Sequence, residues 1–264
     1  MLAGGFLAGC GDGEEAVVDS GLESQEGVSL EQGIDAATTP ALWAADIPSA
    51  GGTTLEYLAD APGAGGIPVD FSLEGPWDLS RDSAQARLTV ENIDLEDSPL
   101  PEGLTGSGLV SRYSWEGNAL PDEYVYQSLD ESSWRIHGRS DAAAAEVREL
   151  AGVSRILLFP LTPGGGWTDS YTETVDGEQR DLTVAYSVLS YGELSVPAGD
   201  FDAFLVQARV TDVGPDDTAS AIVYLWFVPG IGRAAEIDSL PGEDDALFSR
   251  ASAYYRLADY TDGG

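Results

Sequence analysis

The side chains that could carry out chemistry in this chain are carboxylates, hydroxyls and one imidazole. Its 264 residues include 46 Asp and Glu but one His and one Cys, and all 12 basic residues are Arg. Without Lys there is no P-loop lysine and no Schiff base. One His and one Cys cannot form a poly-His zinc site, a thiolate cluster or a disulfide. The composition therefore predicts no cofactor and limits any reaction to carboxylates, hydroxyls and His137.

His137 is the first candidate for catalysis. In the segment SWRIHGRSD, strand alternation places Arg135 and His137 on the face opposite Trp134. A triad of His137 with Ser140 and Asp141 would crowd three side chains into one turn, which the geometry of such triads rarely allows. We therefore expect a strand-end His satisfied by water or a carboxylate, and we assign no catalytic residue.

Acidic clusters are the second candidate. Neither of the two densest groups has the spacing of an EF-hand, and 46 carboxylates make chance clusters common. We therefore expect solvated side chains and no metal site. A carboxylate pair for glycoside hydrolysis needs no proximity in sequence, so that alternative stays open. The two groups are Asp94, Glu96 and Asp97, and Asp212, Asp216 and Asp217.

The single cysteine, Cys10, follows Leu7, Ala8 and Gly9 in MLAGGFLAGC. This segment resembles the lipobox of bacterial lipoproteins, in which small residues precede a cysteine that is lipidated and becomes the mature N-terminus. An apolar stretch that ends in small residues and is followed at once by a polar segment is consistent with processing there. Residues 1–10 are thus expected to be the remnant of a lipoprotein signal, with Cys10 as the lipidation site.

The segment that follows has the composition of a tether. Residues 11–50 contain nine acidic residues, no basic ones and many Gly, Ser, Ala and Thr. Such a stretch cannot bury enough apolar surface to offset its ordering entropy, so we predict an acidic disordered tether. The formal net charge of the chain is −34, which disfavours nucleic acid as a partner and is typical of adaptation to salt or of a genome that encodes Arg rather than Lys.

Residues 51–264 alternate between short β-branched or aromatic runs and turn residues, which predicts an all-β domain of antiparallel strands. An Ala-rich stretch at 141–151 predicts one short helix. The predicted strands are 53–58, 67–74, 85–92, 108–115, 123–128, 132–137, 155–160, 168–175, 182–191, 202–213, 221–228, 233–237 and 247–257.

Two turns specify the geometry most sharply, and we expect both to be architectural. In SVPAGDF, Pro197 suits the second position of a type I turn, and Gly199 suits the left-handed position after it. In FVPGIGR, Pro229 and Gly230 suit a type II turn, and Gly232 follows. The strand after the first turn places Phe204, Val206, Ala208 and Val210 on one face, and the strand before the second is apolar on both faces.

Three segments in this order, LFPLTPGGGW, YGELSVPAGDFDAFLV and YLWFVPGIGRAAEI, resemble a family of uncharacterised bacterial envelope proteins and lipoproteins related to TapB-like domains. The resemblance covers residues 155–237. It implies an antiparallel and strongly curved sheet, similar to the half-barrel of LolA-type lipoprotein carriers, with a sandwich as the alternative. It implies no known activity.

These observations together predict a lipid-anchored protein of the bacterial cell envelope, facing the periplasm or the cell exterior. We expect it to be non-enzymatic and to bind an apolar ligand or another envelope component in the curved sheet, with the membrane as a partner through its lipid. The alternatives are a secreted carboxylate-dependent hydrolase and a structural or calcium-dependent surface module.

Overall fold

Strands form along most of the chain, and in many of them buried and exposed side chains alternate. The computed structural model describes residues 40–60, 66–116, 121–143, 147–152, 154–175, 178–214 and 218–263. The strands are β1 (Thr54–Asp60), β2 (Ile67–Pro68), β3 (Trp77–Asp78), β4 (Ala86–Ile93), β5 (Leu109–Glu116), β6 (Glu123–Leu129), β7 (Ser133–Asp141), β8 (Val147–Gly152), β9 (Arg155–Leu158), β10 (Gly166–Val175), β11 (Glu178–Val196), β12 (Gly199–Val213), β13 (Thr218–Val228), β14 (Gly232–Ser239) and β15 (Arg250–Thr261).

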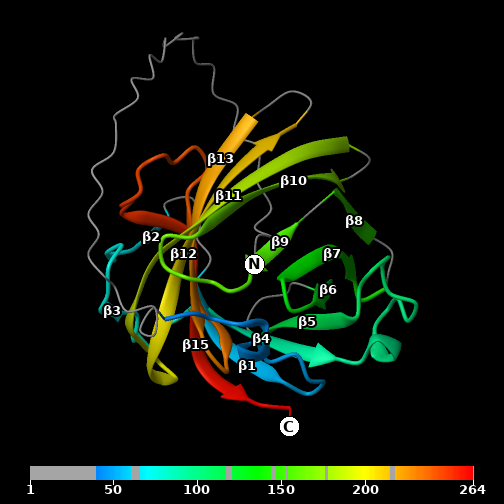
Figure 1. Cartoon of the computed structure of the whole chain (residues 1–264), viewed down its shortest axis with the longest axis horizontal. Helices are drawn as coiled ribbons and strands as arrows, with labels where there is room; N and C mark the ends of the chain where they lie inside the picture. The colour runs from blue at the N-terminus through cyan, green and yellow to red at the C-terminus, as the bar shows by residue number, and fades with distance from the viewer. Residues whose placement is uncertain are drawn as a thin grey trace, which may run out of the picture. The chain divides into compact units, whose positions relative to one another are not determined.

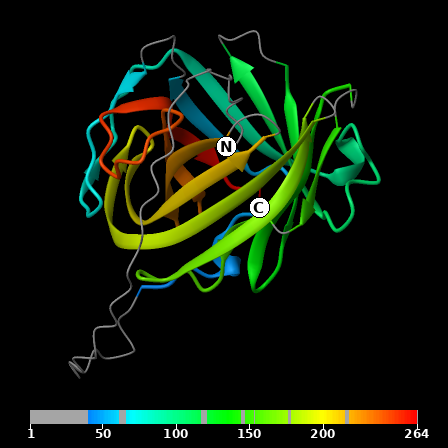
Figure 2. The ribbon, with the colours of Figure 1, turned by 90° about the horizontal axis from the view of Figure 1, so that it is seen from above.

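The strands close into an antiparallel barrel of 12 strands. Its order is β1-β4-β5-β6-β7-β8-β10-β11-β12-β13-β14-β15, and β15 pairs with β1 to complete the ring (Figures 1 and 2). The short strands β2, β3 and β9 pair with β15, β11 and β7 respectively. The all-β antiparallel prediction is confirmed, whereas the open half-barrel and the sandwich are wrong, because β1 is hydrogen-bonded on both sides and leaves no free edge.

The predicted helix at 141–151 is also wrong. Asp141 ends β7, and Val147–Gly152 is β8, which pairs with both β7 and β10. Residues 144–146 lie outside the described part of the chain. The helices in the described ranges are two three-residue 3-10 turns, η1 (Ala44–Asp46) and η2 (Leu95–Asp97). Pairing with two neighbouring strands outweighs the weak helix propensity of a short Ala-rich run.

The folded domain begins earlier than predicted. Leu42, assigned to the tether, is fully buried and pairs with Leu161 through backbone hydrogen bonds of 3.0 and 2.9 Å. Asn92 donates a side-chain hydrogen bond to the carbonyl of Pro48. Residues 40–50 are therefore part of the domain, because the apolar residues of this largely polar segment pack against the barrel. Residues 1–39 lie outside the described part.

The inner and outer faces of the wall follow from β11. Thr183, Ala185 and Ser187 are exposed, and the residues between them are buried, so the exposed set faces outward. On β12, Val206, Ala208 and Val210 pair with the buried set of β11 and therefore face the interior. Phe204 continues the same alternation of β12, although it pairs with Tyr191 beyond a register shift in β11. Among the described residues, no helix has the length and hydropathy needed to cross a membrane.

Part of the outer face is covered as well. Every residue of β13 from Ala221 to Val228 is buried, as expected for a strand that is apolar on both faces. Phe71 packs edge-on against Tyr224 at 4.9 Å between ring centroids, and Trp77 packs against Trp226 at 6.1 Å. The predicted strand at 67–74 is β2 followed by irregular chain, and this segment covers β13 from outside.

Candidate functional site

The register of the wall brings two acidic side chains of β14 into the barrel interior. Val206 on the inner face of β12 pairs with Leu225, and Leu225 pairs with Glu236. Val223 pairs with Asp238 in the same way. Since side chains on directly paired residues share a face, Glu236 and Asp238 point inward. Glu236 is fully buried, and Asp238 is 8% exposed.

Arg233 joins these two acids through an irregularity in the strand. In a regular strand, residues three apart lie on opposite faces. A register shift between Trp226 and Phe227 pairs Arg233 with the inward-facing Phe227, and Arg233 then forms a close ion pair with Glu236. Glu236 is fully buried and the Arg233 side chain is 15% exposed, so this pair stabilises Glu236 in its charged form.

Tyrosines surround this group. The hydroxyl of Tyr57 on β1 donates a 2.6 Å hydrogen bond to the carbonyl of Arg233, whose guanidinium carbon lies 5.7 Å from the centre of the Tyr57 ring. Burial raises the pKa of Tyr57 to about 12. Burial, followed by the charges of Asp238 and Glu236, also raises the pKa of Tyr255. Both phenols therefore stay neutral hydrogen-bonding groups at physiological pH.

Asp238 is the second acid of this group and interacts with Glu236. Its Oδ1 is buried and has no hydrogen-bond partner. Burial, and then the neighbouring Glu236 carboxylate with which it interacts directly, raise the pKa of Asp238 well above its ordinary value. Two buried carboxylates in contact cannot both ionise cheaply, so the second holds a proton unless a cation is present.

Further ion pairs extend the charged layer around the interior. Arg139 on β7 donates to Glu123 on β6 at 3.2 Å, and Arg180 on β11 donates to Asp212 on β12 at 2.9 Å. Tyr113 on β5 lies near the Arg139–Glu123 and Arg233–Glu236 pairs, and burial raises its pKa, with the charges of Arg233 and Arg139 opposing the shift. The inner wall thus carries charged and phenolic side chains beside apolar ones, since Leu225 and Phe227 are paired directly with Glu236 and Arg233.

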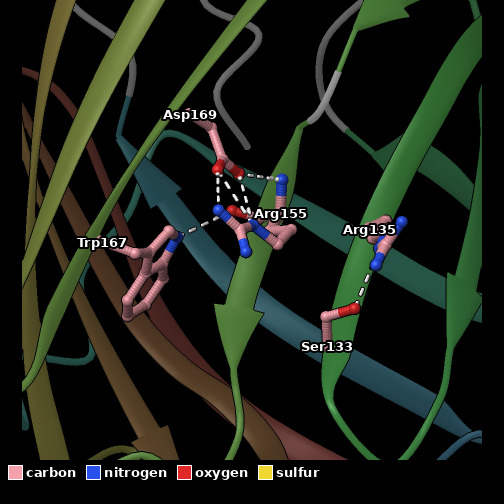
Figure 3. A network of polar contacts seen from close by, with 5 residues as sticks. All are labelled: Ser133, Arg135, Arg155, Trp167 and Asp169. Carbon is pink, nitrogen blue, oxygen red and sulfur yellow. Dashed lines mark hydrogen bonds and ion pairs between the residues drawn. The ribbon is translucent and has the colours of Figure 1, made fainter.

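Another buried carboxylate joins β9 to the barrel. Asp169 on β10 accepts hydrogen bonds from the backbone N–H and from the guanidinium of Arg155 on β9, at 2.6 and 2.9 Å, with Trp167 beside them (Figure 3). Trp167 stacks on Tyr186 at 4.6 Å. Because β9 pairs with β7 alone, the Asp169 side chain supplies the link to β10 that backbone hydrogen bonds do not.

An ionic cluster of different composition lies on the outer face. Arg256 on β15 is fully buried and donates a 3.0 Å hydrogen bond to Asp60 on β1. Asp60 also accepts from Arg81 at 2.9 Å and from the backbone N–H of Gln85 at 3.1 Å. The guanidinium of Arg256 stacks over the ring of Tyr254, at 4.3 Å. This cluster fastens the segment before β4 to the wall.

The structure does not assemble the triad considered around His137. The His137 ring is within hydrogen-bond distance of the Ser128 hydroxyl on β6, at 2.8 Å, whereas the Ser140 hydroxyl contacts Tyr126 at 3.3 Å. Burial, followed by the charge of Arg135, lowers the pKa of His137. Its partner is thus a neighbouring strand hydroxyl rather than the expected water or carboxylate.

The other predicted sites lie apart from the interior. Cys10 is outside the described residues. Pro197 and Ala198 form the first turn, and Gly199 opens β12 with a φ of +134°. Gly230 and Gly232, around the second turn after Pro229, have φ of +78° and +92°.

The candidate calcium clusters can be followed only in part. Asp94, Glu96 and Asp97 are exposed around η2, and Asp212 is engaged by Arg180. Asp216 and Asp217 lie outside the described residues. Within the described part of the chain, no group of three His, Cys, Asp or Glu side chains is arranged to hold a metal.

Sequence reasoning missed Glu236 and Asp238. The strand at 233–237 was predicted, but its acids were not distinguished from the other 44 of the chain. The signal in the sequence is the spacing of Glu236 and Asp238, which are two residues apart and therefore lie on the same face of a strand. That strand follows a strand that is apolar on both faces. Which face is buried depends on the register, which one sequence does not specify.

The comparisons place this arrangement among known folds. No family model and no curated protein matches the chain. A candidate lipoprotein of Parabacteroides distasonis has a TM-score of 0.51 at 12% identity, over 84% of this chain and 100% of that one. A candidate exported protein with a YmcC-like fold from Bacteroides fragilis has a TM-score of 0.49 at 13% identity, over the same shares. The first likeness defines the class: an all-β barrel protein, here with a charged interior.

Proposed function

We propose that this chain is a lipid-anchored protein of the bacterial envelope, non-enzymatic, that binds a small amphiphilic molecule inside its barrel. The observation that carries the binding role is the charged and phenolic layer on the inner wall, centred on Arg233, Glu236 and Asp238. Burying charges is costly, so a barrel with only a structural role would fill its interior with apolar side chains.

The number of strands supports the same role. Eight strands already give an interior that side chains can fill or that holds one small ligand, and the diameter grows with strand number. Twelve strands therefore enclose more room than side chains alone need. The apolar side chains of the inner wall, such as Phe204, Leu225 and Phe227, suit the hydrocarbon part of a ligand, and the charged and phenolic side chains beside them suit its polar part.

The envelope location is supported by two observations. Cys10 ends a segment that resembles a lipobox, and the fold is similar to that of the Parabacteroides distasonis candidate lipoprotein. A lipid at Cys10 would make the membrane a partner and leave the barrel free to bind its ligand in the periplasm or at the cell surface.

A carboxylate-dependent hydrolase is the second candidate, favoured by the coupled pair Glu236 and Asp238. Glycosidases hold their two carboxyl groups about 5 Å apart or more so that the substrate or a water fits between them. Glu236 and Asp238 instead interact directly. This closeness favours binding over hydrolysis.

Anchoring is tested by the variant Cys10→Ala, expressed in its own host with the upstream sequence. The variant should move from the detergent phase to the aqueous phase on phase separation, while the control Ser20→Ala stays in the detergent phase. Unchanged membrane association of Cys10→Ala would contradict the anchor.

Binding is tested by native mass spectrometry of protein extracted from the envelope of its own cells. The expected spectrum contains a species heavier than the lipidated chain by the mass of a small molecule that denaturation releases. A spectrum with only the lipidated chain would contradict the binding role.

A further inference from the structure

Residues 40–50, which we call the strap, are attached to strands on different sides of one end of the barrel. At this end β4 stops and β5 begins, where Ile93 pairs with Val110. Further round the ring, β6 stops, β7 begins and β9 stops at the same end, because these strands are antiparallel neighbours. In the other direction β1 begins and β15 stops here, where Thr54 pairs with Thr261, so β14 also begins here.

The strap first joins two separated parts of this end. Leu42 pairs with Leu161 in the loop between β9 and β10, through hydrogen bonds of 3.0 and 2.9 Å. Four residues later, the carbonyl of Asp46 accepts a 2.8 Å hydrogen bond from the N–H of Gly230, in the turn between β13 and β14. Strands β11 and β12 lie between these two points in the ring, so the strap passes from one side of the end to another.

A third contact places the strap over the interior side of the wall. Tyr57 contacts Arg233 inside the barrel and pairs with Leu88 of β4. Asn92 lies four residues further along the same strand and therefore on the same inner face. The Asn92 side chain donates a 3.3 Å hydrogen bond to the carbonyl of Pro48 in the strap.

A row of hydrogen bonds along the inner wall holds Asn92 in place for this contact. The Ser111 hydroxyl on β5 donates to the side-chain oxygen of Asn92 at 2.8 Å. Gln127 on β6 donates to the Ser111 hydroxyl at 2.8 Å, and Trp134 on β7 donates to Gln127 at 2.6 Å. The row joins four neighbouring strands and fixes the orientation in which the Asn92 amide N–H meets the strap.

The strap is attached less extensively than the strands of the wall. Its buried apolar side chains are Leu42, which is fully buried, and Ile47, at 5% exposure, whereas Trp43 is 55% exposed. In the described part of the chain, the pairing of Leu42 is an isolated bridge and not part of a ladder. Segments with few buried contacts open at a lower free energy than strands that are paired on both sides.

We infer that the strap closes this end of the barrel and opens as a unit while the wall stays folded, so that it gates the entry of a ligand into the interior. Its release uncovers the inner face of β4 at Asn92. This inference rests on the proposed ligand-binding role and specifies the route by which the ligand enters.

Opening is tested without a ligand, by NMR hydrogen exchange of the full chain. The N–H groups of Leu42, Leu161 and Gly230 bond across the strap, and they should exchange at least about tenfold faster than the paired amides of β12. Leu42→Ala should speed their exchange by a further factor of about ten or more. The control Leu205→Ala, equally buried on the outer face of β12, should change it by less than about twofold.

Gating is tested by stopped-flow fluorescence with N-phenyl-1-naphthylamine, a neutral apolar probe that the net charge of −34 neither attracts nor repels. Leu42→Cys with Leu161→Cys, in a Cys10→Ala background, allows a disulfide to lock the strap, because paired residues of this kind have Cα atoms about 5.5 Å apart. The oxidised protein should take up the probe at least about tenfold more slowly than the same protein after reduction. Leu42→Ala should take it up faster than wild type.

The outcomes separate this inference from the proposed function. Exchange of the three strap-bonded amides in step with those of β12 would show that the strap opens only when the barrel unfolds, and would overturn the inference. Equal uptake by the oxidised and reduced proteins would also overturn it and leave a ligand-binding barrel with another entrance. Uptake by none of the variants, together with a native mass spectrum without added mass, would overturn both the gate and the proposed function.

Discussion

Two buried aspartates on opposite faces of the same wall have different surroundings. Asp60 on the outer face accepts hydrogen bonds from Arg81, Arg256 and the backbone of Gln85. Asp238 on the inner face neighbours a second acid, Glu236, and has an oxygen without a partner. The two residues are similarly buried, at 3% and 8% exposure.

The difference separates the structural role of Asp60 from the binding role proposed for the barrel interior. Both oxygens of Asp60 accept hydrogen bonds from protein donors, and removal of this carboxylate leaves the buried Arg256 without its acidic partner. A carboxylate that lacks donors destabilises the fold whenever it is ionised. Such an arrangement is retained at a cost in stability, which is typical of functional sites.

The largest effect is expected from Asp60→Ala. The variant leaves Arg256, which is fully buried, without its carboxylate partner, and removal of one member of a buried pair costs about 3–5 kcal/mol. Urea denaturation at neutral pH measures this loss. The control is Glu56→Gln on the same strand, whose contact with Arg87 is 3.7 Å long and exposed, and which should cost at most about 0.5 kcal/mol. Equal losses of unfolding free energy in the two variants would contradict the structural role of Asp60.

The assignment of Asp60 and Asp238 to opposite faces of the wall depends on the register of β11 to β14. The variant Gly199→Val tests this register. Gly199 has a φ of +134° at the start of β12, where any side chain strains the backbone by about 1–2 kcal/mol. Chemical denaturation should show this loss, while Asp200→Asn, at the exposed neighbouring position, should be near neutral. Full stability of Gly199→Val would mean that this turn, and the faces assigned from it, are incorrect.

Asp238→Asn should change the pH dependence of stability rather than the stability at low pH. Because the pKa of Asp238 is raised in the folded state, the folded protein holds this proton more tightly than the unfolded chain. Wild type should therefore lose stability relative to the variant as pH rises from the ordinary value of 3.8 through the raised pKa, by at most about 1.4 kcal/mol per pH unit. Denaturation midpoints of both proteins across this range provide the measurement. Parallel curves would show that Asp238 ionises as an exposed residue does.

The smallest effect concerns salt. The net charge of −34 should destabilise the folded state through self-repulsion at low ionic strength. Thermal midpoints should rise by a few degrees between low salt and about 1 M, where the screening length is about 3 Å. The rise should be the same in wild type and Asp238→Asn, since a buried site is screened little. A flat curve would favour genome composition over saline adaptation as the origin of the acidity.

Much of the fold could be predicted from the sequence because alternation and turn residues are local signals. The strands predicted at 85–92 and 123–128 correspond to β4 and β6, and the double-sided apolar strand at 221–228 lies in the covered part of the wall. Closure was not predictable, because it depends on pairing between β1 and β15, about 200 residues apart. The predicted helix at 141–151 is wrong because residues 147–152 pair with β7 and β10, and this pairing outweighs their local helix propensity.

The candidate site was less predictable than the fold. Arg233 and Glu236 share a face only because a register shift follows Trp226, and no residue type in RAAEID marks that shift. The candidate residues that the sequence analysis singled out, His137 and the acidic clusters, are not members of the group around Arg233 and Glu236. Residues that meet only through the register of distant strands cannot be identified from a single sequence, whereas turns such as Pro197–Gly199 can be predicted from their residue types.

The most direct test of the contrast between the two aspartates is an NMR titration of the Asp side-chain carboxyl carbons, with Asp238→Asn and Asp60→Asn used to assign the two signals. We expect the Asp238 signal to keep its protonated position at pH values where exposed carboxyls have ionised. The Asp60→Asn variant should leave the Asp238 signal unchanged, because the two residues lie on opposite faces of the wall. An Asp238 signal that titrates near its ordinary value of 3.8 would contradict the account.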